Sequence, residues 1–288
     1  VATAPVFPRA CILSMRTHPP ASSASMNPAF LLATLASLCF GLALNTGRMG
    51  LRHLAPRAGA VIGVPTSTLM FLLLAPFTIE PSAFDLAAFG VFALVGLFFP
   101  AGVTLVTYRS NEALGPTVTA ALISGTAPLF AIGAAWLLLG EAIPAKAAGV
   151  TLCVGLGIGL MAWKPGGLRQ GLLSPLLVWP LSGALMRGLA QACIKLGLAL
   201  WPNAFAASLV AYVMSTFTVL AFRRLDGPAR ERPSAAGVFW FACTGALNGA
   251  GLCLMYIALI DTPVALVAPI VAAYPVVTLL VSGLLGQE

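Results

Sequence analysis

Three polar side chains in the second half of the sequence have a spacing that places them on one face of a helix. Arg187, Gln191 and Lys195 follow one another at intervals of four residues within a long apolar segment, and an α-helix brings such residues onto the same side. A cation at bilayer depth costs about 2.5–3.5 kcal/mol on insertion scales, so it usually faces protein, water or a ligand. Such a stripe can bind a carboxylate or phosphate group from a cavity. The alternative is that Arg187 snorkels to the interface or bonds to a carbonyl freed near Pro180.

Amides in two other apolar segments are further candidates for a binding cavity. Asn45 lies three residues before Arg48 and four after Gly41, so these residues share a helix face. Asn248 stands among glycines, which favour close helix contact. Both amides are candidates for the cavity, and the alternative is that each bridges two helices. Arg48 and Lys195 are interpreted as interfacial anchors in preference to ligands.

A proline and an acid recur at one fixed interval. Pro275 follows Pro128, and Glu288 follows Glu141, by the same 147 positions. Because proline removes a helix hydrogen bond, both prolines are expected to break matching helices, where freed carbonyls line the cavity or form a hinge. An inherited kink that shapes only packing is the alternative. Glu141 is expected to cap the helix that follows it through the helix dipole, in preference to a role in gating.

The composition is that of a polytopic membrane protein. Of the 288 residues, 59% are hydrophobic and 8% are charged, with a mean hydropathy of +0.99, against about 25% charge in soluble domains. Most of the fifteen Lys and Arg residues are spread through short gaps, which argues against nucleic-acid binding and indicates contact with lipid headgroups. The six cysteines lack metal-binding spacing, and enzyme motifs such as GxSxG and HExxH are absent. We therefore expect no metal, no cofactor and no catalysis.

Nine segments have the length and polarity of membrane helices, so we expect an all-α fold. About 20 residues suffice to cross about 30 Å of hydrocarbon as a helix. The expected spans are 29–47, 58–77, 86–107, 115–139, 145–163, 174–197, 203–222, 235–260 and 263–285. Residues 1–28 are expected to be a disordered or misassigned tail, with Met26 as the physiological start.

The spans form two similar sets. Gly41 and Gly188 show the offset of 147 positions, and Tyr108 and Tyr256 show one of 148. A repeat with an odd number of helices must lie in the membrane in the opposite orientation to its partner, which is the inverted-repeat plan of secondary transporters. The expected domains are a first five-helix repeat, 29–163, and a second repeat, 174–288, truncated before its fifth helix.

The junction between the fourth and fifth spans resembles the drug/metabolite transporter superfamily, specifically its EamA-type permeases. "AP" (127–128) lies in mid-helix, "LLLGE" (137–141) ends that helix, and the glycine-rich "AGVTLCVGLGIGLMAW" (148–163) follows. The resemblance extends from about Phe30 to Glu288. It implies a ten-helix bundle around a central cavity that moves small organic solutes across a membrane, with the tenth helix missing from this chain.

The resemblance favours a secondary transporter of small organic metabolites or drugs that works by alternating access. A truncated, non-transporting remnant or a membrane assembly partner is the alternative, and a membrane-embedded enzyme is a weaker one. All eight acids fall near span ends, which favours exchange or facilitated movement over proton coupling. The expected partners are the lipid bilayer and a small organic solute, anionic ones included, and the expected location is the inner membrane of a bacterium.

The orientation in the membrane stays open at this stage. Most Lys and Arg residues fall in the gaps after odd-numbered spans, which places those gaps in the cytoplasm and the N-terminus outside. Members of the resembled family are usually drawn with a cytoplasmic N-terminus. The sequence leaves the oligomeric state open as well.

Overall fold

The computed structural model describes residues 28–79, 84–114, 116–142, 149, 152–153, 156, 175–225 and 234–284. Within them the chain is helical and contains no strand. The helices are α2 (Pro28–Leu51), α3 (Pro56–Thr78), α4 (Leu86–Phe98), α5 (Ala101–Leu114), α6 (Pro116–Leu139), α9 (Val178–Leu200), α10 (Ala204–Leu225), α11 (Ala235–Asp261), α12 (Val264–Ala272) and α13 (Tyr274–Leu284), with the short 3₁₀ helix η2 (Pro175–Leu177).

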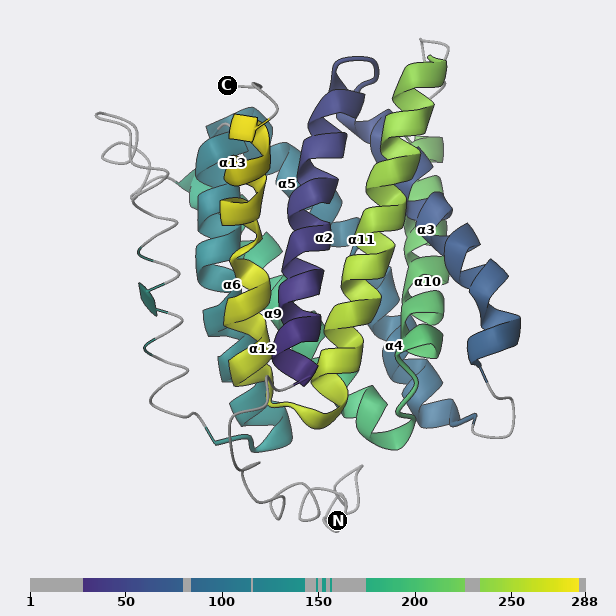
Figure 1. The fold of residues 1–288 in the computed structure, drawn as a ribbon, viewed down its shortest axis with the longest axis vertical. Coiled ribbons are helices and arrows are strands. Elements are labelled where there is room, and N and C mark those ends of the chain that lie inside the picture. The colour runs from purple at the N-terminus through teal and green to yellow at the C-terminus, as the bar shows by residue number, and fades with distance from the viewer. Residues whose placement is uncertain are drawn as a thin grey trace.

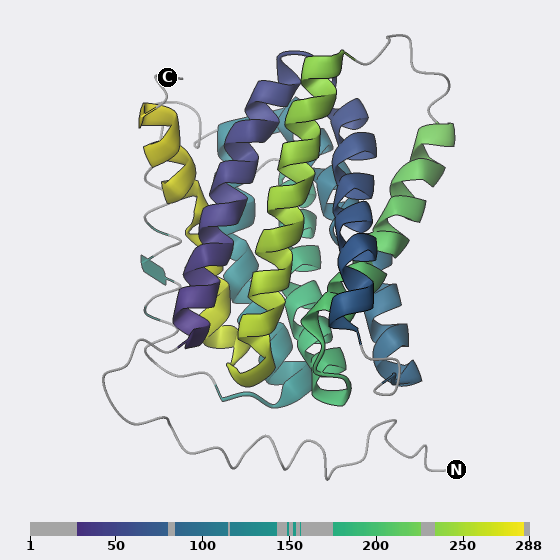
Figure 2. The ribbon, with the colours of Figure 1, turned by 45° about the vertical axis from the view of Figure 1, so that its right-hand side comes forward.

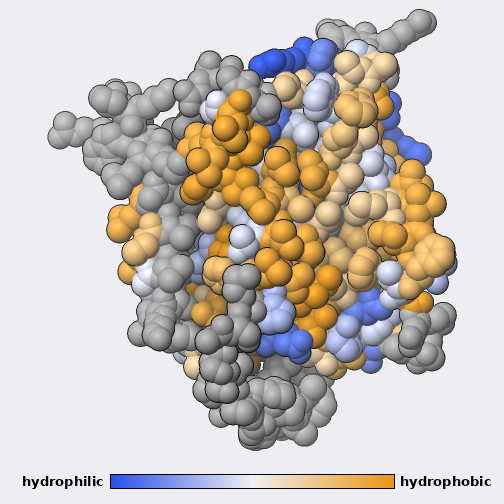
Figure 3. Space-filling model, in the orientation of Figure 1, coloured by the Kyte–Doolittle hydropathy of each residue, from blue (hydrophilic) through white to orange (hydrophobic). Residues whose placement is uncertain are grey.

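These helices form a bundle in which the long elements run roughly along one axis (Figures 1 and 2). Eight helical segments of the described residues are long and apolar enough to cross a membrane. They coincide with eight of the nine expected spans, and the expected span 145–163 lies largely outside the described residues. In Figure 3, apolar side chains cover the middle of the visible face and hydrophilic ones gather near its two ends. This is the surface that a helical protein presents to a hydrocarbon layer.

Local sequence signals set several helix starts. The Asp85 side chain accepts a hydrogen bond from the backbone N–H of Ala88 at 2.7 Å, and Ser234 Oγ accepts one from Gly237 N–H at 3.1 Å. Each of these side chains satisfies an N–H that has no partner within its helix. α3 instead begins at Pro56, where the missing N–H costs nothing.

Two of the spans are interrupted by a helix break. A third span, in which Pro128 was expected to cause a break, is continuous. The third span consists of α4 and α5, which are separated at Phe99 and Pro100, and the last consists of α12 and α13, which are separated at Ala273. Pro275 therefore stands beside a helix break, as expected. α6, in contrast, continues through Pro128 without a break. A proline can be carried inside a membrane helix where neighbouring groups compensate for the lost hydrogen bond.

Two helix crossings use the same kind of contact. At the first crossing, Gly245 in α11 packs so closely on the Gly63 carbonyl of α3 that a Cβ at Gly245 would collide with it. Ser67 Oγ donates to the Gly245 carbonyl at 2.7 Å. A Cβ at Gly96 in α4 would lie 2.6 Å from the Ala211 carbonyl of α10. At that second crossing Ser215 Oγ donates to the Gly96 carbonyl at 2.6 Å. Small residues and hydroxyls thus let the backbones approach closely.

A second set of contacts joins the first described helix to the last, and two middle helices to each other. A Cβ at Gly41 in α2 would lie 2.6 Å from Val277 Cβ in α13, and a Cβ at Gly188 in α9 would lie 2.6 Å from Phe130 Cβ in α6. The partners in each pair match across the sequence, since Gly188 follows Gly41 and Val277 follows Phe130 by 147 positions. α6 and α9 consequently pack side by side and hold the polar face of α9 against α6.

Candidate functional site

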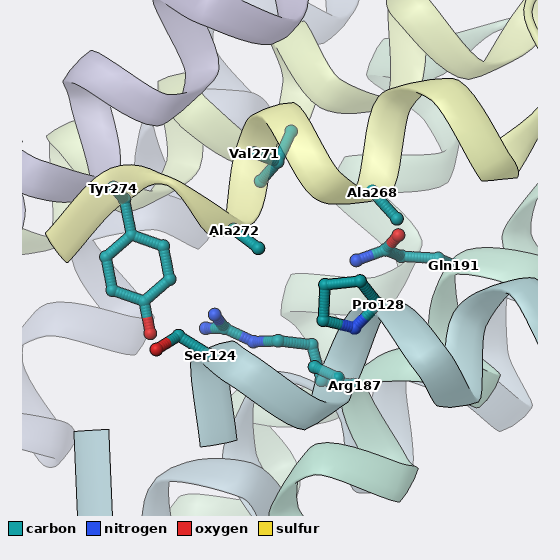
Figure 4. A pocket seen from close by; sticks show the side chains of 9 residues that line it. Ser124, Pro128, Arg187, Gln191, Ala268, Val271, Ala272 and Tyr274 are labelled. Atoms are coloured by element: carbon teal, nitrogen blue, oxygen red, sulfur yellow. The ribbon is translucent and has the colours of Figure 1, made fainter. Parts of the chain in front are cut away.

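Arg187 and Gln191 of α9 line a narrow pocket inside the bundle. Its other walls come from α6 and from the α12–α13 break, and the space between these walls, open solvent included, is about 220 Å³. Figure 4 shows the Arg187 and Gln191 side chains directed into the same space from successive turns of α9. The lining residues are Ser124, Ala127, Pro128, Arg187, Gln191, Ala268, Val271, Ala272 and Tyr274.

The Arg187 guanidinium lies over an aromatic ring in this pocket. Its Cζ is 5.4 Å from the centroid of the Tyr274 ring, within the range of a cation–π interaction. Its Nε is buried and has no hydrogen-bond partner. The N–H groups of a planar guanidinium point outward from its edge. Arg187 therefore keeps at least one buried donor available to a group in the pocket.

Gln191 contributes an unpaired acceptor one turn further along α9. Its side chain is 4% exposed, and its Oε1 is buried without a hydrogen-bond partner. A buried polar atom that lacks a partner costs free energy. A donor and an acceptor in this condition, in one pocket, are therefore best accounted for by a polar occupant.

The third member of the α9 stripe, Lys195, makes a different set of contacts. Its Nζ lies 2.9 Å from Glu141 Oε1 and also donates to the Thr262 carbonyl at the end of α11. The other carboxylate oxygen of Glu141, Oε2, accepts a hydrogen bond from Val264 N–H at 2.9 Å. This network joins α6, α9, α11 and α12 at one end of the bundle. Lys195 is largely buried, unlike an anchor that reaches to the interface.

Glu141 caps a helix other than the one expected. Its carboxylate meets the first N–H of α12, where the positive end of the helix dipole favours an anion. Gly140 has φ +64°, a left-handed conformation that glycine adopts without strain, and it ends α6 just before Glu141. This turn places the carboxylate toward α9 and α12. The helix that Glu141 was expected to cap, 145–163, lies largely outside the described residues.

Asn45 and Arg48 lie away from the pocket, between α2 and α13. Asn45 Nδ2 donates to the Gly41 and Thr278 carbonyls at 3.2 and 3.3 Å. Its Oδ1 accepts a hydrogen bond from Ser282 Oγ at 2.7 Å. The Ser282 hydroxyl in turn accepts one from Arg48 Nη1 at 3.1 Å. Asn45 thus bridges two helices, which is the alternative that its sequence position left open.

The remaining candidates divide between the pocket and its surroundings. Pro128 is buried and lines the pocket, and Pro275 follows Tyr274 at the start of α13. Asn248 is half-buried in α11 and is not among the lining residues. Among the described residues, no group of three or more His, Cys, Asp or Glu side chains is placed to hold a metal ion.

Sequence reasoning missed Tyr274 and Ser124. A signal for Tyr274 was present, because it directly precedes Pro275 and stands 147 positions after Ala127, so a ring replaces a methyl group at matched positions. Ser124 lies one helical turn before Pro128 on the same face of α6, and that spacing could have indicated it. Neither residue carries a charge or an amide, which are the features that indicated the other candidates.

Residues 27–163 match the EamA-like transporter family. The match covers α2 to α6 and extends to the end of the glycine-rich segment on which the sequence resemblance rests. No protein among curated sequences matches the chain.

Proposed function

We propose that the chain, whose residues 27–163 match the EamA-like transporter family, is a secondary transporter that moves small organic anions by alternating access between two inverted repeats. The single observation that carries this proposal is the pocket at Arg187, into which the half-buried Arg187 brings a buried, unpaired Nε and Gln191 brings a buried, unpaired Oε1. We place the protein in the inner membrane of a bacterium, with lipid around the bundle.

The choice of an anion follows from the charges in and around the pocket. Among the described residues that line the pocket, Arg187 is the one that carries a charge. Glu141 is not a lining residue and pairs with Lys195. A cation that faces a dry cavity is stabilised when a carboxylate or phosphate enters. Binding and release of the anion would then occur at the depth of the bilayer, between α6, α9 and the α12–α13 break.

Pairs of equivalent contacts support the inverted repeats. The hydrogen bond from Ser67 to Gly245 has a counterpart in the one from Ser215 to Gly96. The donors are separated by 148 positions and the acceptors by 149. Such agreement is expected if the two halves share one fold and pack on each other in the same way twice.

The Glu141–Lys195 ion pair supports a state that is closed at one end. It fastens the ends of α6, α9 and α11 to the start of α12. Arg48, which precedes Lys195 by 147 positions, donates to the Ser282 hydroxyl near the other end of the bundle. In an inverted-repeat transporter, the opposite state is reached when the two halves exchange conformations. The Glu141–Lys195 ion pair would then open. We therefore assign a gating role to Glu141, Lys195 and Arg48. Pro128 and Pro275 would allow α6 and the α12–α13 span to bend.

Uptake into proteoliposomes tests the transport function. Purified protein is reconstituted and given a panel of radiolabelled monocarboxylates, dicarboxylates, phosphate esters and neutral analogues, with the same panel preloaded inside to allow exchange. We expect uptake of at least one anion above protein-free liposomes. Arg187→Leu should abolish that uptake, whereas Arg223→Gln, which removes an exposed cation at the end of α10, should leave it intact. Equal uptake by Arg187→Leu and the wild type would contradict the assigned site.

A further inference from the structure

We propose that Tyr274 is a positioning residue for Arg187, and that its ring holds the guanidinium so that the Nε edge is presented to an oxyanion in the pocket. This inference rests on the proposed function, because it concerns the same pocket. Tyr274, which carries no charge, would determine which ligand geometry Arg187 can accept.

The Tyr274 ring is itself held on two sides. On one side the Arg187 guanidinium lies 5.4 Å from the ring centroid. Phe40 of α2 makes an edge contact with the same ring, with centroids 6.4 Å apart and planes at 66°. Tyr274 is 7% exposed, so the ring has little room to turn. Arg187 consequently rests on a fixed surface instead of sampling the pocket with a flexible side chain.

The position of Tyr274 in the chain explains why the ring reaches Arg187. α12 ends at Ala272, and α13 begins at Tyr274 with Pro275 as its second residue. Proline cannot donate a hydrogen bond to the preceding turn, so the span is interrupted at this point. In Figure 4 the Tyr274 ring extends from the break toward the Arg187 side chain and the Ser124 hydroxyl.

The position of the ring limits where a ligand can meet Arg187. The Tyr274 ring lies on one side of the guanidinium, whose donors lie in its plane, so an incoming group meets the part of the edge that the ring leaves open. An edge that includes Nε matches two oxygens of one carboxylate or phosphate in a bidentate pair. The buried, unpaired Nε is the donor that this geometry leaves open. The pocket is narrow, which favours a small oxyanion.

This arrangement exists at one of two matched places in the chain. At the positions 147 residues earlier, Ala127 stands for Tyr274 and Phe40 stands for Arg187. Ala127 lines the same pocket, and Phe40 contacts the Tyr274 ring. The first half therefore supplies one wall, through α6, and the second half supplies the other lining residues, which include both the cation and its aromatic support. One oxyanion per chain is the stoichiometry that follows.

The test is ligand-dependent thermal stabilisation of the purified, detergent-solubilised protein, which does not depend on transport. The probes are sodium pyruvate and inorganic phosphate. Methyl pyruvate is the uncharged control for pyruvate, and sodium chloride at equal ionic strength is the control for salt. Variants are Tyr274→Phe, which keeps the ring, Tyr274→Leu, which removes it, and Arg187→Lys, which keeps the charge without the planar edge. Size-exclusion profiles confirm that each variant is folded.

The quantity compared between the variants is the concentration of anion that gives half of the maximal thermal stabilisation. We expect Tyr274→Phe to stay within about twofold of the wild type and Tyr274→Leu to weaken binding about tenfold. Arg187→Lys should weaken it as well, and methyl pyruvate should give no stabilisation. A stronger effect of pyruvate selects a carboxylate, and a stronger effect of phosphate selects a phosphoryl group.

Three results would overturn the proposal. Unchanged binding by Tyr274→Leu would show that the ring does not position Arg187. Equal stabilisation by methyl pyruvate would show that the pocket does not select an oxyanion. If neither anion stabilises the wild type, the pocket does not bind an oxyanion. Uptake in proteoliposomes that persists in any of these cases would leave the transport function standing, so the two failures are distinguishable.

Discussion

The hydroxyl oxygens of Thr68 in α3 and Thr216 in α10 lie 2.8 Å apart in the interior of the bundle. The two residues are separated by 148 positions, the offset that also relates Ser67 to Ser215. A residue that touches its own counterpart in a repeat lies on the axis that relates the two copies. In the proposed inverted-repeat transporter, the Thr68–Thr216 contact would mark the axis around which the two halves exchange conformations.

The two serine hydrogen bonds should be energetically equivalent if the halves are related in this way. Ser67→Ala and Ser215→Ala each remove one buried bond to a glycine carbonyl, worth about 0.5–1.5 kcal/mol in membrane and soluble proteins. We expect the two losses of stability to agree within about 0.5 kcal/mol. Unfolding in mixed detergent–SDS micelles measures both. A large loss in one variant and none in the other would argue against equivalent packing.

Glycine positions provide a test of the close helix approach with an internal control. A Cβ at Gly188 would lie 2.6 Å from the Ala131 backbone nitrogen of α6, whereas a Cβ at Gly133 would meet nothing within 4 Å. Gly188→Ala should therefore destabilise the protein by about 1–3 kcal/mol through overpacking. Gly133→Ala should be neutral or slightly stabilising, because alanine is the better helix former. The same unfolding measurement compares them, and equal effects would mean that α6 and α9 are further apart than described.

Much of the architecture was accessible from the sequence because lipid imposes strong constraints. Apolar runs of about 20 residues must be helical when no water can satisfy the backbone, and eight such helices lie where the pattern predicts them. The spacing of Arg187 and Gln191 likewise predicted that they share a face of one helix, and both line the same pocket. The helix break at the last span was indicated by Pro275, but the matching proline, Pro128, does not break α6. Whether a proline bends or interrupts a helix depends on neighbours that the local sequence does not reveal.

The partners of the site residues depend on tertiary packing and were less predictable. Glu141 pairs with Lys195, which is 54 positions away, and caps α12, which is 123 positions away from it. Sequence proximity had instead suggested the next helix. Tyr274 was missed because its role depends on the approach of α9 to the α12–α13 break. These relations arise from helix crossing and leave no periodic signal within a segment.

The Glu141–Lys195 ion pair should contribute more than a surface pair. Both side chains are mostly shielded, with 14% and 11% exposure, and removal of one partner leaves the other charge uncompensated. We expect Glu141→Gln and Lys195→Met each to cost about 2–4 kcal/mol, and the double variant to cost less than their sum. Asp261→Asn, at an exposed acid at the end of α11, should change stability by less than about 0.5 kcal/mol. Strict additivity in the double-mutant cycle would show that the pair is not coupled.

The distribution of charge predicts the orientation in the membrane. The C-terminal ends of α2 and α10 and the N-terminal end of α3 lie at one end of the bundle (Figures 1 and 2), and they carry Arg48, Arg52, Arg57, Arg223 and Arg224. The positive-inside rule places this end in the cytoplasm. In intact cells, a membrane-impermeant maleimide should label Asp85→Cys and spare Arg52→Cys, each in a cysteine-free background. The reverse labelling pattern would place the N-terminal end of α2 in the cytoplasm.

Alternating access at the Arg187 pocket is tested most directly by a single cysteine at Gln191, probed from each side of oriented proteoliposomes with a membrane-impermeant methanethiosulfonate. The account predicts that Gln191→Cys reacts from both sides. When Glu141→Cys and Lys195→Cys are added and cross-linked, reaction should persist only from the side opposite the cross-link, where Arg48 lies. Reduction of the cross-link should restore two-sided access. Reaction from one side alone in the uncross-linked protein, unchanged by reduction, would contradict alternating access at this pocket.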